Sequence, residues 1–165
     1  MDKNSLSPSM FIGVQGENII SFGSGQPDLP PPEEVYSILP NYRDFKYGLI
    51  QGTLELREAL ARQYPRSTAD SFVVTNGASE AIDLVLRVIS QRHKKQKSKV
   101  LIVRPYYYSY PHMVRFAGME PVFTDSIDGR IDLEDFTSKV IDCKAVIINS
   151  PSNPTGRVES IETLK

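Results

Sequence analysis

The chain has 165 residues, and its 40% hydrophobic and 24% charged content is typical of a soluble globular protein rather than a disordered one. Its 19 basic and 20 acidic side chains give a formal charge of −1, which excludes the basic surface expected of a protein that binds nucleic acid or an anionic membrane. A single cysteine, Cys143, excludes an internal disulfide, and the N-terminus lacks the pattern of a signal peptide. From the single cysteine and the N-terminal pattern we expect a cytoplasmic protein. The two histidines, His93 and His112, are isolated in the sequence, so we predict no metal site.

The first 45 residues are irregular in pattern and rich in Gly, Pro and Ser. The consecutive prolines of Pro30–Pro32 prevent regular strand pairing there, and Glu33–Leu39 is expected to form a short helix. Further along, Thr53–Tyr64 has apolar residues at helical spacing, behind a threonine suited to the N-cap position. This stretch therefore predicts an amphipathic helix.

Short apolar runs then alternate with helical segments. The expected strands are Ser71–Thr75, Lys99–Val103, Glu120–Thr124 and Lys144–Ile148. The expected helices are Ala78–Ser90, Tyr110–Ala117 and Leu133–Lys139. The first of them is apolar on most of its circumference, so we expect it to be buried on most of its circumference. Five-residue apolar runs separated by helices favour right-handed βαβ units. The predicted fold class is α/β, a three-layer αβα arrangement around a mainly parallel sheet.

Three strand-to-loop junctions of this predicted sheet carry polar or aromatic residues, and in a parallel sheet all three open on the same edge. The first is Thr75–Ala81 (TNGASEA), where a strand ends at Asn76–Gly77 and a helix begins with Ala78 and Ser79. Small side chains leave the first amides of the helix accessible, which suits a phosphate monoester. The alternative is an ordinary turn followed by a helix cap.

The second junction, Arg104–Tyr110 (RPYYYSY), places four tyrosines within five positions directly after a strand. This number predicts that some rings face a ligand or an interface. The alternative is that they pack between layers or subunits.

The third junction is Asn149–Arg157 (NSPSNPTGR), in which Asn153 lies between Pro151 and Pro154. The two prolines fix φ at their own positions and restrict the residues before them, so the Asn153 amide is held as a donor on a rigid loop. A phosphate site, an aromatic platform and a fixed amide donor at one edge describe a pocket for a flat phosphorylated ring. Pyridoxal 5'-phosphate fits that description.

The sequence resembles the N-terminal part of class I/II aminotransferases of the pyridoxal-phosphate fold type I superfamily. The resemblance runs from about Ile20 to Val158 and is carried, in this order, by GSGQPD, Tyr47 followed by Gly52, LREALA, TNGASEA, PYYYSYPHMVRFAG and NSPSNPTG. It implies an N-terminal arm with part of a small domain over residues 1–45, and the first part of a large cofactor-binding domain over residues 46–165.

The resemblance also implies the cofactor-binding residues. Gly77, Ala78 and Ser79 correspond to the turn and amides that bind the cofactor phosphate. Tyr107 corresponds to the ring that stacks on the pyridine, and Asn153 to the amide that bonds the phenolic oxygen.

Two further residues follow from the same resemblance. Gly25 corresponds to a backbone position near the substrate carboxylate, and Tyr47 to a tyrosine that reaches the cofactor phosphate of a neighbouring subunit. The implied assembly is a homodimer, the implied substrates are an amino acid and a 2-oxo acid, and the implied reaction is amino-group transfer by a ping-pong route.

Members of this family are longer than this chain. The resemblance predicts three residues that no position here matches, which are an Asp that pairs with the pyridine nitrogen, a Lys that binds the cofactor covalently and an Arg that holds the substrate carboxylate. Since the Lys is the amine nucleophile, we expect this chain to be an incomplete N-terminal fragment that has no catalytic residue of its own and is inactive alone.

Two alternatives share these motifs. One is a fold type I enzyme with a different reaction, such as a carbon–sulfur lyase or an aminocyclopropane-carboxylate synthase type, because the cofactor carries the chemistry and the unmatched part helps to choose the outcome. The other is a non-catalytic sensor domain of a transcription regulator. Such regulators carry a DNA-binding domain upstream, and the roughly twenty residues before Ser21 are too few for one.

Overall fold

A computed structural model describes residues 18, 20, 29–93 and 98–165. The chain divides into two compact units, residues 1–47 and 48–165. In the first unit, α1 (Glu33–Ile38) is followed by the 3-10 helix η2 (Leu39–Asn41). Two glutamates in the first turn of α1 complement the positive end of the helix. The short helix expected here is confirmed.

The second unit begins with a helical segment. In α2 (Leu54–Gln63), the Thr53 side chain accepts a hydrogen bond from the Leu56 amide at 3.4 Å, which confirms the predicted helix and its N-cap. The 3-10 helix η3 (Ala69–Ser71) follows, closed by a reciprocal pair of bonds between Thr68 and Ser71.

Three parallel strands form the sheet in the order β2–β1–β5. Strands β1 (Lys99–Val103) and β2 (Glu120–Thr124) have the predicted bounds, whereas β5 (Cys143–Ile147) begins and ends one residue earlier than predicted. Their register aligns Leu101 of β1 with Val122 on one side and Val146 on the other.

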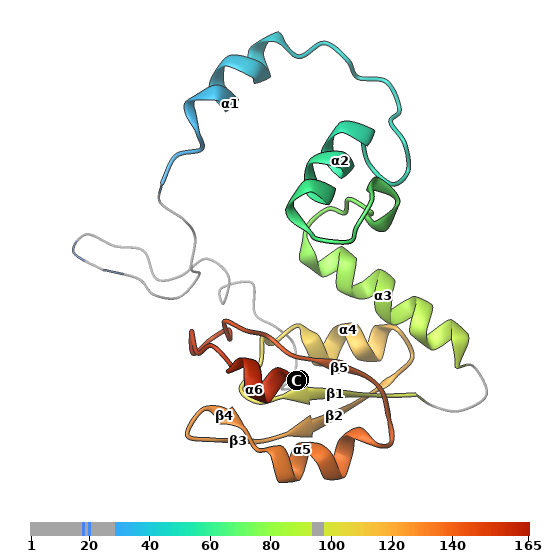
Figure 1. The fold of residues 1–165 in the computed structure, drawn as a ribbon, viewed down its shortest axis with the longest axis vertical. Helices are drawn as coiled ribbons and strands as arrows, with labels where there is room; N and C mark the ends of the chain where they lie inside the picture. The colour runs from blue at the N-terminus through green and yellow to red at the C-terminus, as the bar shows by residue number, and fades with distance from the viewer. Residues whose placement is uncertain (1–17, 19, 21–28, 94–97) are drawn as a thin grey trace. The chain divides into compact units, whose positions relative to one another are not determined.

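Helices cover both faces of this sheet (Figure 1). The chain passes from β1 to β2 through α4 (Tyr110–Phe116) and returns across β1 to β5 through α5 (Leu133–Val140). Because the two crossovers run in opposite directions, right-handed connections put their helices on opposite faces, as Figure 1 shows. Helix α3 (Ala78–Arg92) packs against α4. The predicted three-layer αβα arrangement is confirmed.

The core lies between the sheet and the α3–α4 pair. Val100 and Ile102 of β1 are fully buried there against Val114 of α4 and Leu86 of α3. Leu101, also fully buried, lies between them in the sequence and points to the other face because side chains alternate along a strand. Burial on both faces explains why β1 reads as a continuous apolar run.

Two short elements were not predicted. Strands β3 (Ser126–Ile127) and β4 (Arg130–Ile131) form an antiparallel hairpin between β2 and α5, and α6 (Ile161–Leu164) follows the loop after β5. The hairpin turn has positive φ at both central residues, Asp128 and Gly129. The Asp-Gly pair is the sequence signal that could have indicated this hairpin.

The predicted strand Ser71–Thr75 is wrong. Ser71 belongs to η3, and residues 72–75 are assigned to no strand in the described part of the chain. The Val74 amide instead donates to the Gln51 carbonyl at 2.8 Å. A strand requires a neighbour in a sheet, which a local apolar pattern cannot supply.

The prediction that the helix from Ala78 is buried on most of its circumference is also wrong. Leu86 of α3 is buried, but Leu84, Val85 and Val88 are 43–59% exposed. The reason is that α4 and one face of the sheet cover only one side of the helix. These residues leave apolar surface uncovered on α3, and β5 ends the described sheet with an edge that pairs with no further strand there.

Candidate cofactor site

The turn before α3 presents the first candidate group. Gly77 is the N-cap residue, with φ of 85°, and a Cβ there would meet nothing within 4 Å. Ala81 donates the first helical bond to the Gly77 carbonyl, so the amides of Ala78 and Ser79 lie ahead of the helical ladder. The Glu80 carboxylate accepts from the Asn76 amide at 2.5 Å and holds the turn from within. This geometry can bind an anion at the two leading amides, beside an internal carboxylate cap.

The tyrosines after β1 divide into two pairs. Tyr106 stacks on Phe123 of β2, with ring centroids 5.2 Å apart, and both Tyr106 and Tyr110 pack against the core. For these two rings, the packing alternative is correct. Tyr107 and Tyr108 are half-buried, and their rings lie 4.6 Å apart.

Hydrogen bonding distinguishes the hydroxyls of this cluster. The Tyr107 hydroxyl lies 3.4 Å from that of Tyr108, and hydrogen bonds with Ser109 and then Tyr108 lower the pKa of Tyr107. Burial raises the pKa of Tyr110, whose ring meets Tyr107 edge-on at 5.5 Å. Tyr107 thus contacts both Tyr108 and Tyr110, of which Tyr110 packs against the core.

The loop after β5 is held by its own hydrogen bonds. The Ser152 amide donates to the Arg157 carbonyl at 2.8 Å, and the Gly156 amide donates to the Ser152 carbonyl at 2.6 Å. With its amide oriented to satisfy both partners, Asn149 donates to the Pro151 carbonyl and accepts from the Asn153 amide at 2.8 Å. The backbone at Asn153 is thus fixed, while its side chain is exposed.

Two clefts border the exits of β1 and β5. A small cleft is lined by Pro105 and Tyr110 after β1, by Asn149 and Ser152 after β5, and by Gly129 of the hairpin. A more open groove is lined by Ala81 and Ile82 of α3 and by residues of β5, and again by Tyr110 and Ile148. Tyr110 and Ile148 line both clefts, so Ala81 and Ile82 of α3 border the same groove as one residue that follows β1 and one that follows β5.

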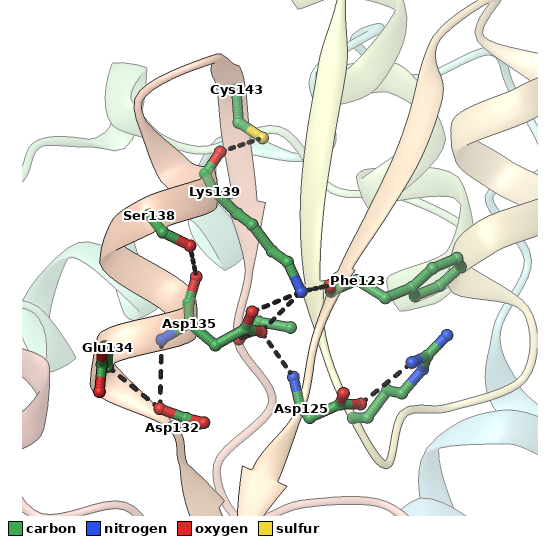
Figure 2. A network of polar contacts seen from close by, with 10 residues as sticks. Phe123, Asp125, Asp132, Glu134, Asp135, Ser138, Lys139 and Cys143 are labelled. Carbon is green, nitrogen blue, oxygen red and sulfur yellow. Dashed lines mark hydrogen bonds and ion pairs between the residues drawn. The ribbon is translucent and has the colours of Figure 1, made fainter.

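A network of polar contacts ties the exit of β2 to α5 (Figure 2). The buried Thr124 hydroxyl donates to Asp135 at 2.8 Å, and the Asp125 amide donates to the same carboxylate at 3.2 Å. Lys139 donates to Asp135 and, at 2.9 Å, to the Phe123 carbonyl. The hydrogen bond from Lys139, followed by that from Thr124, lowers the pKa of Asp135.

This network continues to the exit of β1, because Arg104 pairs with Asp125 at 3.0 Å and lies over the Phe123 ring, 4.6 Å from its centroid. This cluster was not predicted from the sequence. The available signals were the four-residue spacing of Asp135 and Lys139 and the N-cap residue Asp132, whose carboxylate accepts from the amides of Glu134 and Asp135.

None of the predicted site residues lines either of these two clefts; Gly77, Ala78, Ser79, Tyr107 and Asn153 lie on the segments that flank them. Tyr47, the last residue of the first unit, is fully exposed, and Gly25 lies outside the described residues. In the part of the chain that the structure describes, no group of three or more His, Cys, Asp or Glu side chains is arranged to hold a metal ion. The helices of that part include none that is long and apolar enough to cross a membrane.

Comparison with known proteins identifies the family. The sequence model for class I and II aminotransferases matches residues 17–165. The chain belongs to this family. Aspartate aminotransferase from Bacillus subtilis (strain 168) is 30% identical over 98% of this chain and 45% of that protein. Aspartate/prephenate aminotransferase from Thermus thermophilus is 32% identical over 98% of this chain and 46% of that protein.

Solved structures of the family share the fold. Aspartate aminotransferase from Thermus thermophilus with maleate matches with a TM-score of 0.76 and 32% identity, over 86% of this chain and 39% of that one. An amino transferase from Eubacterium rectale matches with a TM-score of 0.79 and 26% identity, over 90% of this chain and 40% of that one. The fold is therefore part of the αβα domain of fold type I aminotransferases, and the chain spans less than half the length of the relatives it matches.

Proposed function

We propose that the complete protein is a pyridoxal-phosphate-dependent aminotransferase that moves an amino group between an amino acid and a 2-oxo acid. The observation that carries the proposal is the family match over residues 17–165, together with relatives that are named aminotransferases. The clefts at the exits of β1 and β5 support it, because open α/β sheets bind ligands at the carboxyl ends of their strands.

The described residues fit the cofactor at three points. The leading amides of α3 at Ala78 and Ser79, behind the open turn at Gly77, suit its phosphate. The half-buried ring of Tyr107 suits stacking on a pyridine, and the exposed Asn153 amide suits donation to a phenolic oxygen. When bound, the cofactor supplies an electron sink for loss of the substrate α-proton.

In this proposal the chain's own residues bind and orient. The amides at the start of α3 set the depth of the phosphate, and the Tyr107 ring sets the plane of the pyridine and excludes water from one of its faces. The Asn153 amide would favour the ionised form of the oxygen to which it donates, because a hydrogen bond to a charged group stabilises the charge. These three contacts fix the ring in one orientation, as a reaction at a single bond of the substrate requires.

The same proposal includes a homodimer and an acidic amino acid as substrate. Full exposure leaves the Tyr47 hydroxyl accessible to a neighbouring subunit, and we assign Gly25 to the substrate carboxylate on the resemblance alone. The relatives named above act, by their names, on aspartate or prephenate, and one solved structure holds maleate, a dicarboxylate. We therefore take aspartate as the first amino donor to test.

The test uses the protein expressed from its complete reading frame. Added pyridoxal 5'-phosphate should produce a visible absorption band that borohydride bleaches, and aspartate with 2-oxoglutarate should yield oxaloacetate and glutamate. A protein that gives neither the band nor the products would refute the proposal. A band accompanied by release of a thiol or of a cyclic amino acid would favour the lyase or cyclopropane-forming alternatives.

A matched pair of ring variants tests the site itself. Tyr107→Ala should weaken cofactor binding about tenfold, since removing a stacking ring removes a contact of ~1–3 kcal/mol on the scale measured for aromatic stacking. Tyr108→Ala, a change of the same size at the neighbouring position, should have a smaller effect. Equal losses in the two variants would contradict the assignment of Tyr107.

A further inference from the structure

Arg157 connects the loop that carries Asn153 to a separate element of the fold. Its carbonyl accepts from the Ser152 amide within the loop. Its guanidinium donates through Nη1 to the Asp128 carbonyl, in the turn of the β3–β4 hairpin, at 2.6 Å. The bond joins residues 29 positions apart, and its charged donor makes it stronger than the neutral bonds inside the loop.

The hairpin turn is shaped to receive this side chain. A Cβ at Gly129 would lie 3.2 Å from Cδ of Arg157 and 3.4 Å from its Nη1, so the arginine passes close over the glycine. Gly129 also has φ of 73°, a conformation that a larger residue adopts only with strain. The bond to Asp128 and the missing Cβ at Gly129 are two separate features that point to the same contact.

This contact reaches Asn153 through Ser152. The Ser152 amide and carbonyl are both bonded within the loop, to Arg157 and Gly156, and Ser152 lines the small cleft together with Gly129. Bonds within a loop fix its shape, whereas a bond to another element adds a second point of attachment to the covalent one at the end of β5. The Arg157–Asp128 bond is such an attachment.

We propose that Arg157 is a positioning residue that couples the β3–β4 hairpin to the loop and thereby sets the place of the Asn153 amide. In this proposal Arg157 acts on the cofactor only through the position of Asn153. The significance for the cofactor rests on the proposed function, whereas the attachment of the loop does not. A displacement of the amide by about 1 Å is enough to weaken a geometry-dependent hydrogen bond substantially.

The experiment compares Arg157→Ala with Arg130→Ala in the protein expressed from its complete reading frame. Arg130 is an exposed arginine of the same hairpin, so both variants remove one positive charge from the same region. Arg157→Ala should weaken binding of pyridoxal 5'-phosphate about tenfold, as the loss of one charge-assisted bond predicts. It should also raise the pKa at which the visible band of the bound cofactor changes, in the same direction as Asn153→Ala. Arg130→Ala should change neither.

A double-mutant cycle separates positioning from general stability. If Arg157 acts through Asn153, then Arg157→Ala should have little further effect on binding or on the pKa in an Asn153→Ala background. Arg157→Lys, which keeps the charge and can donate to Asp128, should restore part of the loss. Additive losses, or an Arg157→Ala variant that behaves like Arg130→Ala, would overturn the proposal.

Two further measurements keep the test decisive. If Arg157→Ala fails to fold, Gly129→Ala, whose Cβ pushes the arginine away from the turn, replaces it in the same cycle. Amide hydrogen exchange at Ser152 and Gly156 should be faster in Arg157→Ala and Gly129→Ala than in Arg130→Ala. If neither the wild type nor any variant binds the cofactor, the proposed function fails. The exchange rates still decide whether Arg157 anchors the loop. Unchanged exchange would show that it does not.

Discussion

Two regions of the second unit are stabilised in different ways. The sheet region, formed by β1, β2 and β5 with α4 and α5, buries whole apolar side chains such as Leu101 and Val114. The helical region, residues 48–75, instead buries a charged side chain, Arg57, which is 5% exposed. Its apolar residues Leu54, Leu56, Tyr64 and Val73 remain 45–61% exposed.

Arg57 links the parts of the helical region. From α2 its guanidinium donates to the carbonyls of Gly52 and Ala69, at 3.2 and 2.9 Å, and to the carboxylate of Asp70 at 3.4 Å. A few directed bonds can hold a turn, a helix and a 3-10 segment together without an apolar core. The stability of the sheet region therefore depends mainly on apolar packing, whereas that of the helical region depends mainly on individual hydrogen bonds.

The largest expected effect lies in the sheet region. Leu101→Ala removes a fully buried side chain and should lower the free energy of unfolding by ~2–5 kcal/mol, through lost burial and the cavity left behind. Val85→Ala on α3, at a position that is 59% exposed, should change it by about 0.5 kcal/mol or less. Urea unfolding followed by circular dichroism measures both. Similar shifts in the two variants would mean that the exposed side of α3 is covered in solution.

The next effect tests the helical region. Arg57→Ala leaves two carbonyls without their charged donor and should cost ~2–3 kcal/mol. Asp70→Asn removes only the carboxylate, which is 96% exposed, and should cost about 0.5 kcal/mol or less. Thermal unfolding at matched pH measures both. A large effect of Asp70→Asn would contradict the view that the carbonyls, rather than the ion pair, hold Arg57.

A smaller effect is expected for the turn that precedes α2. Gly52 has φ of 97°, and a Cβ there would meet the Val74 side chain at 2.5 Å. Gly52→Ala should therefore destabilise the protein by ~1–2 kcal/mol from the backbone alone, and more if Val74 does not move. Gly77→Ala shares the positive φ but meets no atom within 4 Å, and it should show the backbone cost only. Equal unfolding midpoints for the two variants would refute the contact with Val74.

The smallest effect concerns pH in the sheet region. Because Lys139 and Thr124 lower the pKa of Asp135 in the folded protein, its contribution to stability is present above the ordinary value of 3.8. This contribution is lost as the pH falls through 3.8 and then through the lower folded value. Asp135→Asn has no such contribution to lose. The unfolding midpoints of wild type and variant should therefore differ at neutral pH and converge in acid.

A control on the same helix completes this test. Glu134→Gln makes the same chemical change one residue away, at a side chain outside the Asp135 network. The difference between its unfolding midpoint and that of the wild type should not shrink in acid, whereas the difference for Asp135→Asn should. Wild-type and Asp135→Asn midpoints that stay parallel across the acid range would show that the network does not stabilise the fold.

Much of the fold could be predicted because its signals are local. The Thr53 cap, the apolar runs of β1 and β2 and the helical spacing of α5 depend on residues next to one another, and these elements appear within a residue or two of their predicted bounds. The hairpin was missed although Asp128–Gly129 marks its turn, since two-residue strands are too short to show an alternating pattern.

The sequence predicted that two strand exits share one edge of the sheet, but it did not predict how the side chains there pack. The junctions after β1 and β5 lie along one cleft, as expected of two strands in one parallel sheet. The division of the tyrosines could not be predicted, because the packing of Tyr106 on Phe123 depends on the register of β1 with β2. The roles of Tyr107, Asn153, Tyr47 and Gly25 stay predictions.

By itself, the sequence determined the family, the longer helices and the three parallel strands β1, β2 and β5, because caps, periodicity and short motifs act between neighbours along the chain. Only the tertiary structure decided that residues 72–75 form no strand, that Arg57 is buried, and that Arg157 reaches the hairpin. Each of these depends on a partner distant in the sequence. Whether such a partner lies within bonding distance is a property of the folded chain as a whole.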